Sequence, residues 1–280
     1  KGELMPENKI NQRETPLFDA VMNYLDKSPA YFRIPGHRFE KGINKKWIDF
    51  AGGNIFRMDL TETPLLDDLH NPGGPILEAE LLASELFGSE KTFFLVNGTT
   101  CGNEAMILSL CGGGGEIIIP RNAHKSVLAG LILSGGTPVF VSPEYSKEAG
   151  VPAGVAVSSI EKAIADHPWA KGVFLVSPTY HGLCSDISAS AELCRRQGVP
   201  LVVDEAHGAH CYFSPHLPGG ALTLGADACI QSIHKVTGSL TQSSMLHIAS
   251  KRISEEAVAK ALHLVQSTSP SYLLMVSLDL

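Results

Sequence analysis

The sequence has no uninterrupted apolar stretch of about 20 residues, the length that a membrane-spanning helix requires. It also lacks an apolar signal-peptide core, because residues 1–6 are largely polar. Long clusters of Lys and Arg are missing as well, and the formal net charge is −7, so we expect no nucleic-acid partner. These absences predict a cytoplasmic protein without a membrane partner.

Cysteine pairs with metal-binding or redox spacing are missing too. The six cysteines are scattered, and none forms a Cys-x-x-Cys pair. In a chain of 280 residues this distribution is typical of reduced, partly buried thiols in a cytoplasmic protein. Charged residues make up only 18% of the chain and apolar runs recur throughout, which excludes a disordered protein. The chain is also long enough to bury a large hydrophobic core.

Short apolar runs alternate with helical patterns from residue 76 onward. Helical spacing is found over residues 76–87, 101–110, 126–133, 158–166 and 187–197, and apolar runs lie at residues 93–96, 117–119, 138–141, 173–176, 201–203 and 228–233. Strands that alternate with helices predict βαβ units and a mostly parallel sheet. The strands are continuously apolar, as expected when helices cover both faces of the sheet. We therefore predict an α/β domain over residues 76–280, preceded by an irregular and partly helical segment, residues 1–75.

Ligands of open α/β sheets bind beyond the carboxyl ends of the strands, so the polar residues that follow each strand are the candidates. After the first strand, a glycine turn with the hydroxyls of Thr99 and Thr100 leads directly into a helix. Free backbone N–H groups and the helix dipole attract an anion there, and the segment has neither the dinucleotide nor the Walker A spacing. We interpret it as a phosphate-binding site; the alternative is that one threonine only caps the helix.

Histidine and aspartate residues follow other strands. His124 lies at the head of a predicted helix, where it can stack on a ring or move protons. Asp204 ends a strand covered on both faces, and a carboxylate there is costly unless it pairs with a cation. One interpretation is a metal site formed by Asp204, His207 and His210, with Cys211 as a further ligand. The other is a carboxylate that holds a protonated heterocyclic nitrogen, with His207 beside it.

Lys235 follows the strand predicted over residues 228–233 and precedes a glycine turn. A lysine that is desolvated at a strand end becomes a nucleophile towards carbonyl carbons. Ser232 and His234 flank it with donors for an anion. A phosphate site, a ring-stacking histidine, a buried aspartate and a nucleophilic lysine are the parts that pyridoxal 5′-phosphate (PLP) requires. Together the residues predict a PLP site that needs no metal.

The same residues give the chain a likeness to a known family. It resembles the major domain of the fold type I ornithine/lysine/arginine decarboxylases, especially the shorter bacterial type. The segments that carry the resemblance are FRIPGHR (32–38), PLLDDLH (64–70), NGTT (97–100), PRNAHKS (120–126), SPTY (177–180), DEAHGAH (204–210), SIHK (232–235) and LTQSS (240–244). They span almost the whole chain, and their shared order is specific.

The resemblance implies a role for each candidate residue. Lys235 matches the lysine that carries PLP as a Schiff base, Asp204 the aspartate that pairs with the pyridine nitrogen, and His124 the histidine stacked on the ring. His207 matches a position beside the ring hydroxyl that varies among relatives. The remaining matches are phosphate contacts: Thr100, Cys101 through its backbone, Ser232 and His234.

The resemblance also implies an activity. We expect a PLP-dependent lyase that converts arginine, lysine or ornithine into its amine and CO₂, in polyamine synthesis or acid resistance. Active sites of this fold type lie at a dimer interface, which implies a homodimer or a larger homo-oligomer. Relatives continue into a smaller C-terminal domain that is absent here, and the chain ends inside an apolar, helix-like stretch, so we expect a fragment.

Two alternatives stay open at this stage. The same sheet serves PLP-dependent aminotransferases and oxoamine synthases, because the chemistry is decided by the site and not by the fold. The second alternative is a truncated homologue without catalytic activity, which binds a partner chain and regulates it.

Overall fold

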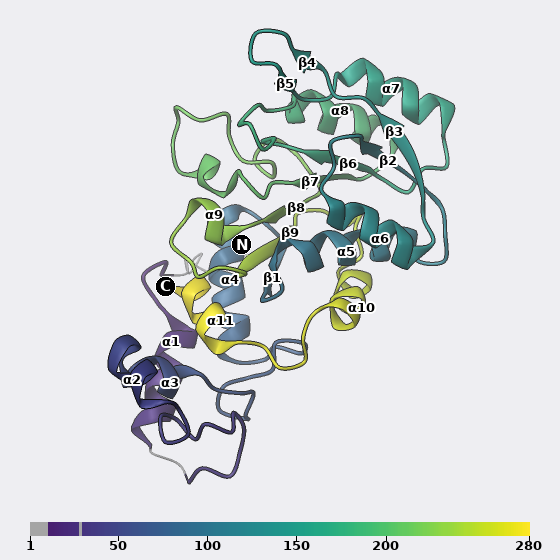
Figure 1. Cartoon of the computed structure of the whole chain (residues 1–280). Helices are drawn as coiled ribbons and strands as arrows, with labels where there is room; N and C mark the ends of the chain where they lie inside the picture. The colour runs from purple at the N-terminus through teal and green to yellow at the C-terminus, as the bar shows by residue number, and fades with distance from the viewer. Residues whose placement is uncertain (1–10, 28–29) are drawn as a thin grey trace, which may run out of the picture.

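The computed structural model describes residues 11–27 and 30–280 and has a seven-stranded sheet at its centre. In spatial order the strands are β1 (Lys91–Leu95), β9 (Ser244–Ile248), β8 (Ala228–Gln231), β7 (Leu201–Asp204), β6 (Val173–Val176), β2 (Glu116–Pro120) and β3 (Thr137–Val141) (Figure 1). Neighbours from β8 to β3 are parallel, and β9 runs antiparallel to both β1 and β8. The predicted, mostly parallel α/β fold is confirmed. The polar start of the chain, residues 1–6, lies outside the described residues.

Helices cover both faces of the sheet. On one face lie α5 (Gly98–Cys111), α6 (Lys125–Ser134) and α10 (Glu255–Val265), and on the other α4 (Pro75–Phe87), α7 (Val157–Asp166) and α8 (Ile187–Gln197). The remaining elements are α1 (Pro16–Asp26), α2 (Lys45–Ala51), α3 (Gly53–Met58), α9 (Ile233–Val236), α11 (Tyr272–Asp279), the 3-10 turn η1 (Ala209–Tyr212), and a hairpin of β4 (Tyr145–Ser146) and β5 (Val151–Pro152). Among residues 11–27 and 30–280, no helix has both the length and the apolar character that crossing a membrane requires.

Burial on both faces explains why the strands are apolar at consecutive positions. Ile117 and Ile119 of β2 belong to the core cluster beneath α5, α6 and α10, whereas Ile118 belongs to the cluster beneath α7 and α8. In β7, Val202 joins the first cluster and Leu201 the second. Successive side chains of a strand point to opposite faces, so in a strand covered twice a polar side chain is costly at every position before the strand ends.

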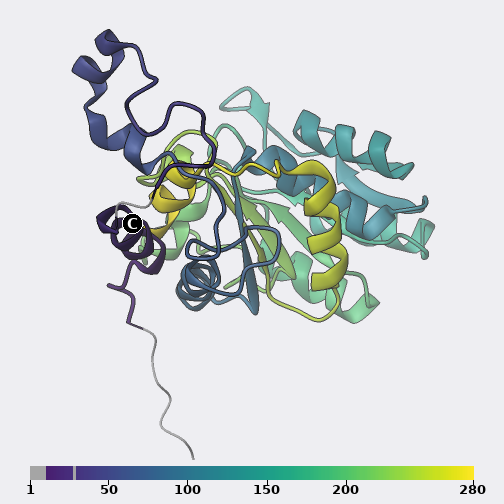
Figure 2. The same cartoon turned by 90° about the horizontal axis from the view of Figure 1, so that it is seen from below.

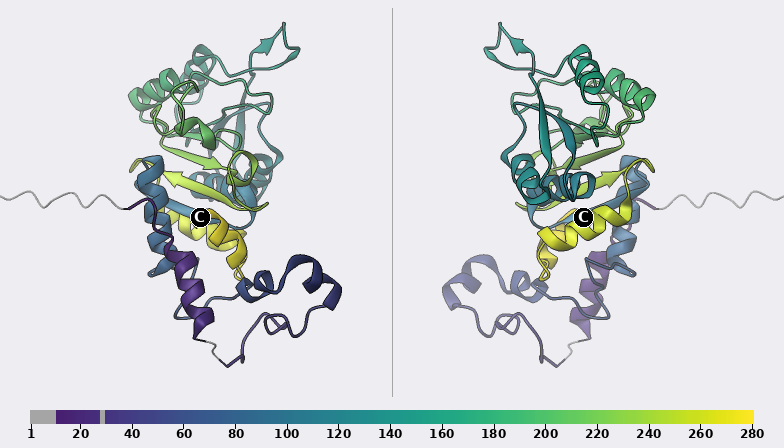
Figure 3. Two further views of the ribbon diagram at one scale, coloured as in Figure 1. Left: turned by 90° about the vertical axis from the view of Figure 1, so that its left-hand side faces the viewer. Right: turned by 90° about the vertical axis from the view of Figure 1, so that its right-hand side faces the viewer.

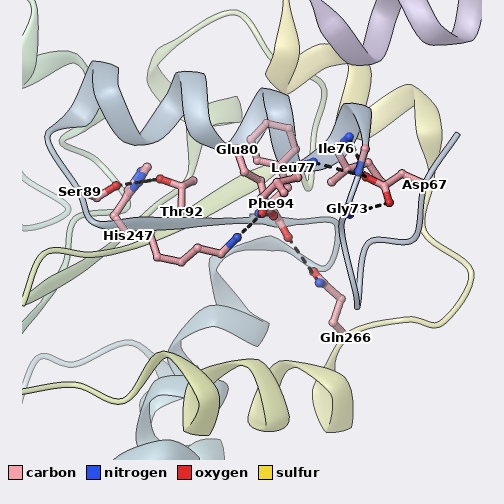
Figure 4. Close-up of polar contacts among 12 residues, drawn as sticks. Asp67, Gly73, Ile76, Leu77, Glu80, Ser89, Thr92, Phe94, His247 and Gln266 are labelled. Atoms are coloured by element: carbon pink, nitrogen blue, oxygen red, sulfur yellow. Dashed lines mark hydrogen bonds and ion pairs between the residues drawn. The ribbon is translucent and has the colours of Figure 1, made fainter. Parts of the chain in front are cut away.

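The free edge of the sheet at β1 is closed by side chains (Figure 4). The buried carboxylate of Glu80 accepts the N–H of Phe94 at 3.0 Å and pairs with Lys91 at 2.7 Å. Burial raises the pKa of Glu80, and the ammonium group of Lys91 opposes that shift. The side-chain oxygen of Gln266 accepts the N–H of Val96 at 2.9 Å. These contacts satisfy backbone donors that another strand could otherwise pair with.

The segment before α4 shares a core with the last helix of the chain. Leu17 of α1 is completely buried in a cluster with Ile76 of α4 and Met275 of α11. In contrast, residues 30–58, which include α2 and α3, extend away from the sheet (Figures 2 and 3). The N-terminal region therefore consists of an anchored helix and a protruding arm.

Asp67 organises the loop that leads into α4 (Figure 4). Its carboxylate accepts the N–H groups of Gly73 at 2.9 Å, Gly74 at 2.8 Å and Ile76 at 3.1 Å. Burial alone would raise the pKa of Asp67, but these backbone donors outweigh it and leave the pKa lowered. Asp67 thus caps the N-terminus of α4 from outside the helix, where its negative charge also meets the positive end of the helix dipole.

We expect Asp67→Asn to destabilise the fold. The amide keeps the size of the side chain but has one acceptor oxygen and no charge, so the free energy of unfolding should fall by about 1–2 kcal/mol. Because the pKa of Asp67 is lowered in the folded chain, this stabilisation is present above its ordinary pKa of 3.8 and is lost as the pH falls through the folded value. Urea unfolding near neutral pH measures the difference. Asp68→Asn, at an exposed neighbour, is the control, and equal midpoints for the two variants would contradict the cap.

Candidate active site

The polar segments that follow the strands meet at one edge of the sheet, where they enclose a cleft of about 540 Å³. The carboxyl ends of β1, β2, β6, β7 and β8 and the amino end of the antiparallel β9 all contribute to it. The lining residues are Asn97, Gly98, Thr99, Thr100, Asn103, Asn122, His124, Val176, Tyr180, Asp204, Ala206, His207, Ser232, His234, Lys235, Thr241 and Gln242. All of the predicted site residues except Cys101 are among them.

The N-terminus of α5 forms one wall of the cleft and has no side-chain cap. The N–H of Gly98, at a φ of 72°, donates to the carbonyl of Gln242 at 2.9 Å and so ties α5 to the loop before β9. The buried hydroxyl of Thr99 contacts the hydroxyl of Ser232, whereas Thr100 is exposed. The wall therefore offers first-turn N–H groups and the hydroxyl of Thr100, an arrangement that binds an anion.

Cys101 and His234 offer fewer hydrogen-bond donors to an anion than the first turn of α5 does. The thiol of Cys101 is buried against the carbonyl of Gly98, at 3.1 Å, and burial raises its pKa to about 12, so only the backbone of this residue is available to an anion. Nδ1 of His234 lies 2.8 Å from the carbonyl of Ser243. Because a carbonyl only accepts, Nδ1 carries a hydrogen, and Nε2 can donate to an anion only when the ring is protonated.

Asp204 is a deeply buried carboxylate at the end of β7, with 3% of the residue exposed. Its two oxygens accept the N–H of Ala206 at 3.1 Å and the side-chain N–H of Asn103 at 2.9 Å. Burial raises the pKa of Asp204, and these hydrogen bonds oppose the shift without cancelling it. In the part of the chain that the structure describes, no Lys, Arg or His forms an ion pair with Asp204. A cationic ligand would therefore relieve the burial of this charge.

Two further acceptors of the cleft lack a donor. Oδ1 of Asn103 and Oδ1 of Asn122 are buried, and neither has a hydrogen-bond partner among the described residues. A buried acceptor without a donor is destabilising. The carboxylate of Asp204 in the same cleft suits a ligand that carries positive charge and an N–H donor, as a protonated pyridine ring does.

Lys235 lies on the short helix α9 and not at the end of a strand. The strand predicted over residues 228–233 ends at Gln231, because the carbonyl of Ser232 accepts the N–H of Lys235 at 3.0 Å and begins a helical turn. The side chain is exposed at the cleft, so the predicted desolvation of this lysine is wrong. Its Nζ lies 3.4 Å from Nε2 of His207, and burial together with the nearby ammonium group lowers the pKa of His207.

The metal interpretation fails on geometry. Among the described residues, no group of three or more His, Cys, Asp or Glu side chains is arranged to hold a metal ion. Asp204 and His207 line the cleft, but His210 does not, because the chain turns into η1 directly after Gly208. The carboxylate of Asp204 is thus left for a ligand that brings its own positive charge.

Asn103, Tyr180 and Gln242 are among the lining residues of the cleft that are missing from the predicted site. Asn103 follows Thr99 by four residues and so lies on the same face of α5, a spacing that could have identified it. The ring of Tyr180 meets that of His207 edge-on, with centroids 5.8 Å apart. Gln242 reaches the cleft only because β9 is antiparallel, which local sequence patterns do not indicate.

Comparisons with known proteins agree with this architecture. A family model described as Orn/Lys/Arg decarboxylase, major domain, matches residues 15–280. The arginine decarboxylase of Bacillus subtilis is 42% identical over 270 residues, and that of Halalkalibacterium halodurans is 43% identical over 268 residues. Each alignment covers 96% of this chain and 55% of the relative, so the chain spans about half the length of the curated relatives it matches.

The same family is found among solved structures. The constitutive lysine decarboxylase of E. coli superimposes with a TM-score of 0.81 at 26% sequence identity, over 95% of this chain and 40% of that protein. This likeness confirms the predicted fold type I architecture. Since the family model covers nearly all of the chain and the curated relatives share more than two fifths of its residues, the chain belongs to the Orn/Lys/Arg decarboxylase family.

Proposed function

We propose that this chain forms the PLP-binding part of a cytoplasmic enzyme that decarboxylates arginine, lysine or ornithine. The observation that carries the proposal is the carboxylate of Asp204, which is buried in the cleft without a cationic partner among the described residues. The uncapped N-terminus of α5 and the exposed Lys235 lie in the same cleft. The names of the relatives, arginine decarboxylase and lysine decarboxylase, support the reaction type.

The residues of the cleft fit the chemical groups of PLP. The first turn of α5 with Thr100 suits the phosphate, and the buried carboxylate of Asp204 suits a protonated ring nitrogen. Lys235 would bind the aldehyde carbon, and His124 would lie against the ring. When bound, PLP supplies an electron sink that makes loss of CO₂ from the α-carbon of an amino acid possible.

Lys235 and His207 are the groups we propose for proton transfer. Replacing the carboxylate of an amino acid by hydrogen consumes one proton, which has to reach the α-carbon from a nearby acid. Nζ of Lys235 and Nε2 of His207 are 3.4 Å apart, and the lowered pKa of His207 favours its neutral form, which can accept a hydrogen bond from the lysine. The pair can therefore hold and pass the proton at the mouth of the cleft.

We also propose that the enzyme is a homodimer in which residues 1–75 and residues 76–280 have different roles. The later residues form the PLP-binding domain, and the earlier ones contribute to the dimer. The protruding arm supports this division, because Phe32 and Phe50 are 97% and 92% exposed. Large apolar side chains gathered on one exposed segment are typical of surfaces that another chain covers. Light scattering of the intact protein distinguishes a dimer from a monomer.

Lys235 should be the residue that PLP modifies. After incubation with PLP and reduction with borohydride, we expect one phosphopyridoxyl group, located on Lys235 by mass spectrometry of the peptides. Lys235→Arg should abolish the adduct, because the guanidinium group stays protonated and cannot attack a carbonyl carbon. Lys162→Arg, at an exposed helical site, should leave the labelling unchanged. Labelling of the folded, intact protein elsewhere, or not at all, would contradict the proposal.

Asp204→Asn should weaken PLP binding and abolish most of the decarboxylation. The amide cannot balance a protonated ring nitrogen, and loss of one partner from a buried charge pair costs about 3–5 kcal/mol, which corresponds to at least about 100-fold in rate. Amine and CO₂ released from arginine, lysine and ornithine measure the activity, with Asp166→Asn as an exposed control. Turnover that requires an added keto acid would identify an aminotransferase, and a folded, PLP-loaded protein without turnover would favour the regulatory alternative.

A further inference from the structure

We propose that Asn103 and Ser126 are positioning residues that hold His124 in the tautomer with its hydrogen on Nε2 and couple this ring to Asp204. The inference rests on the proposed function, because it concerns the same cleft and assigns two residues that the proposed chemistry leaves without a role. It follows from four side chains that α5, α6 with its N-cap residue His124, and β7 bring into one hydrogen-bonded network.

Asn103 stands at the centre of this network and is 1% exposed. Its Nδ2 lies 2.9 Å from Oδ2 of Asp204 and 2.9 Å from Oγ of Ser126. A carboxylate only accepts hydrogen bonds, so the amide must turn its nitrogen towards Asp204. The two hydrogens of Nδ2 are then both used, one for the carboxylate and one for the hydroxyl of Ser126.

The direction of the other hydrogen bonds among these side chains follows, because both hydrogens of Nδ2 are already used. Ser126 is 1% exposed, and its oxygen already accepts from Asn103, so its single hydrogen is free for another acceptor. Nδ1 of His124 lies 2.8 Å from that oxygen and also faces the backbone N–H of Ser126 at 3.3 Å. With two donors aimed at it, Nδ1 has to be the unprotonated nitrogen, and the hydrogen of the neutral ring resides on Nε2.

This tautomer decides what His124 can do in the cleft. The ring lines the cleft, and Nε2–H is the only polar group that it has left, so it acts as a hydrogen-bond donor and not as a base. The two bonds at Nδ1 also fix the plane of the ring, which a residue that lies against the cofactor requires. The proton that decarboxylation consumes is left to Lys235 and His207.

The same network couples His124 to the carboxylate of Asp204. Oδ1 of Asp204 is held by the N–H of Ala206, and Oδ2 is held by Asn103, so the carboxylate cannot rotate without breaking a bond. Loss of Ser126 would leave a buried N–H of Asn103 without an acceptor, and that amide could then turn away from Asp204. A substitution of Ser126 in α6 should therefore alter the hydrogen bonding of the Asp204 carboxylate at the end of β7.

The tautomer can be measured directly in the intact protein without cofactor. Nitrogen-15 spectra of the imidazole side chains, with His124 assigned by its absence in His124→Gln, should show a single form that has its hydrogen on Nε2. In Ser126→Ala, Nδ1 keeps the backbone N–H of residue 126 but loses the hydroxyl donor, so its resonance should move towards the position of a less strongly hydrogen-bonded imine nitrogen and the second tautomer should become populated. Ser126→Thr keeps the hydroxyl and should retain the wild-type pattern.

PLP affinity tests the coupling to Asp204. Asn103→Ala and Ser126→Ala should each weaken binding about tenfold, as expected for one hydrogen bond, and the double variant should be no weaker than the worse single variant. Ser134→Ala removes another buried hydroxyl of α6, which bonds only within its own turn, and should change neither the spectra nor the affinity.

The two experiments separate the inference from the proposed function. A hydrogen on Nδ1 of His124 in the wild-type protein, or an unchanged Nδ1 resonance in Ser126→Ala, would overturn the inference whether or not PLP binds. Additive losses of affinity in the double variant would refute the coupling while leaving the PLP site intact. Wild-type protein that shows the Nε2–H form but does not bind PLP would contradict the proposed function and not the hydrogen-bonded network.

Discussion

The burial of the carboxylate of Asp204 is the constraint around which the cleft is built. A charge at the end of a strand that helices cover on both faces loses the solvation of water, and the raised pKa of Asp204 reflects that loss. Two hydrogen bonds from within the chain offset part of it. A cationic ligand would supply a further part, so this buried carboxylate selects for positive charge in what binds there.

The antiparallel strand β9 has two consequences for this cleft. It places the loop before the strand, with Gln242, at the same edge as the carboxyl ends of the parallel strands, where the carbonyl of Gln242 fixes the turn at Gly98. It also pairs with β1, which would otherwise lie apart from the sheet and could not deliver α5 to the cleft. The side chains of Glu80 and Gln266 accept the outer N–H groups of Phe94 and Val96, so the strand that leads into the wall that we assign to phosphate is held on both sides.

Burial is distributed unevenly over the side chains of the cleft. The side chains that hold the cleft, Asn103, Ser126 and Asp204, come from regular elements of the central sheet and its helices and are almost completely buried. Lys235 is exposed on a helix of a single turn, where its ammonium group can approach and leave a bound molecule. The protruding arm of residues 30–58 stands apart from both. Buried, hydrogen-bonded side chains beside an exposed lysine suit a site that holds a ring and exchanges substrates.

The helices and strands from α4 to β8, except the hairpin β4–β5 and the turn η1, could be predicted from the sequence, because apolar runs such as residues 117–119 and helical spacing are local properties of the chain. The same holds for Asp204 and the turn at Thr100, which follow strands and are polar where the core ends. The sequence could not indicate that β9 pairs antiparallel, that Lys235 sits on a helical turn, or that Asn103 joins Asp204 to Ser126. The pairing of β9 with β1 and the bond from Asn103 to Asp204, 101 positions further along the chain, exist only once the sheet has formed. The sequence by itself thus determined the fold class and the types of chemical group at the cleft, and the tertiary structure decided how these groups share their hydrogens and which of them stay exposed.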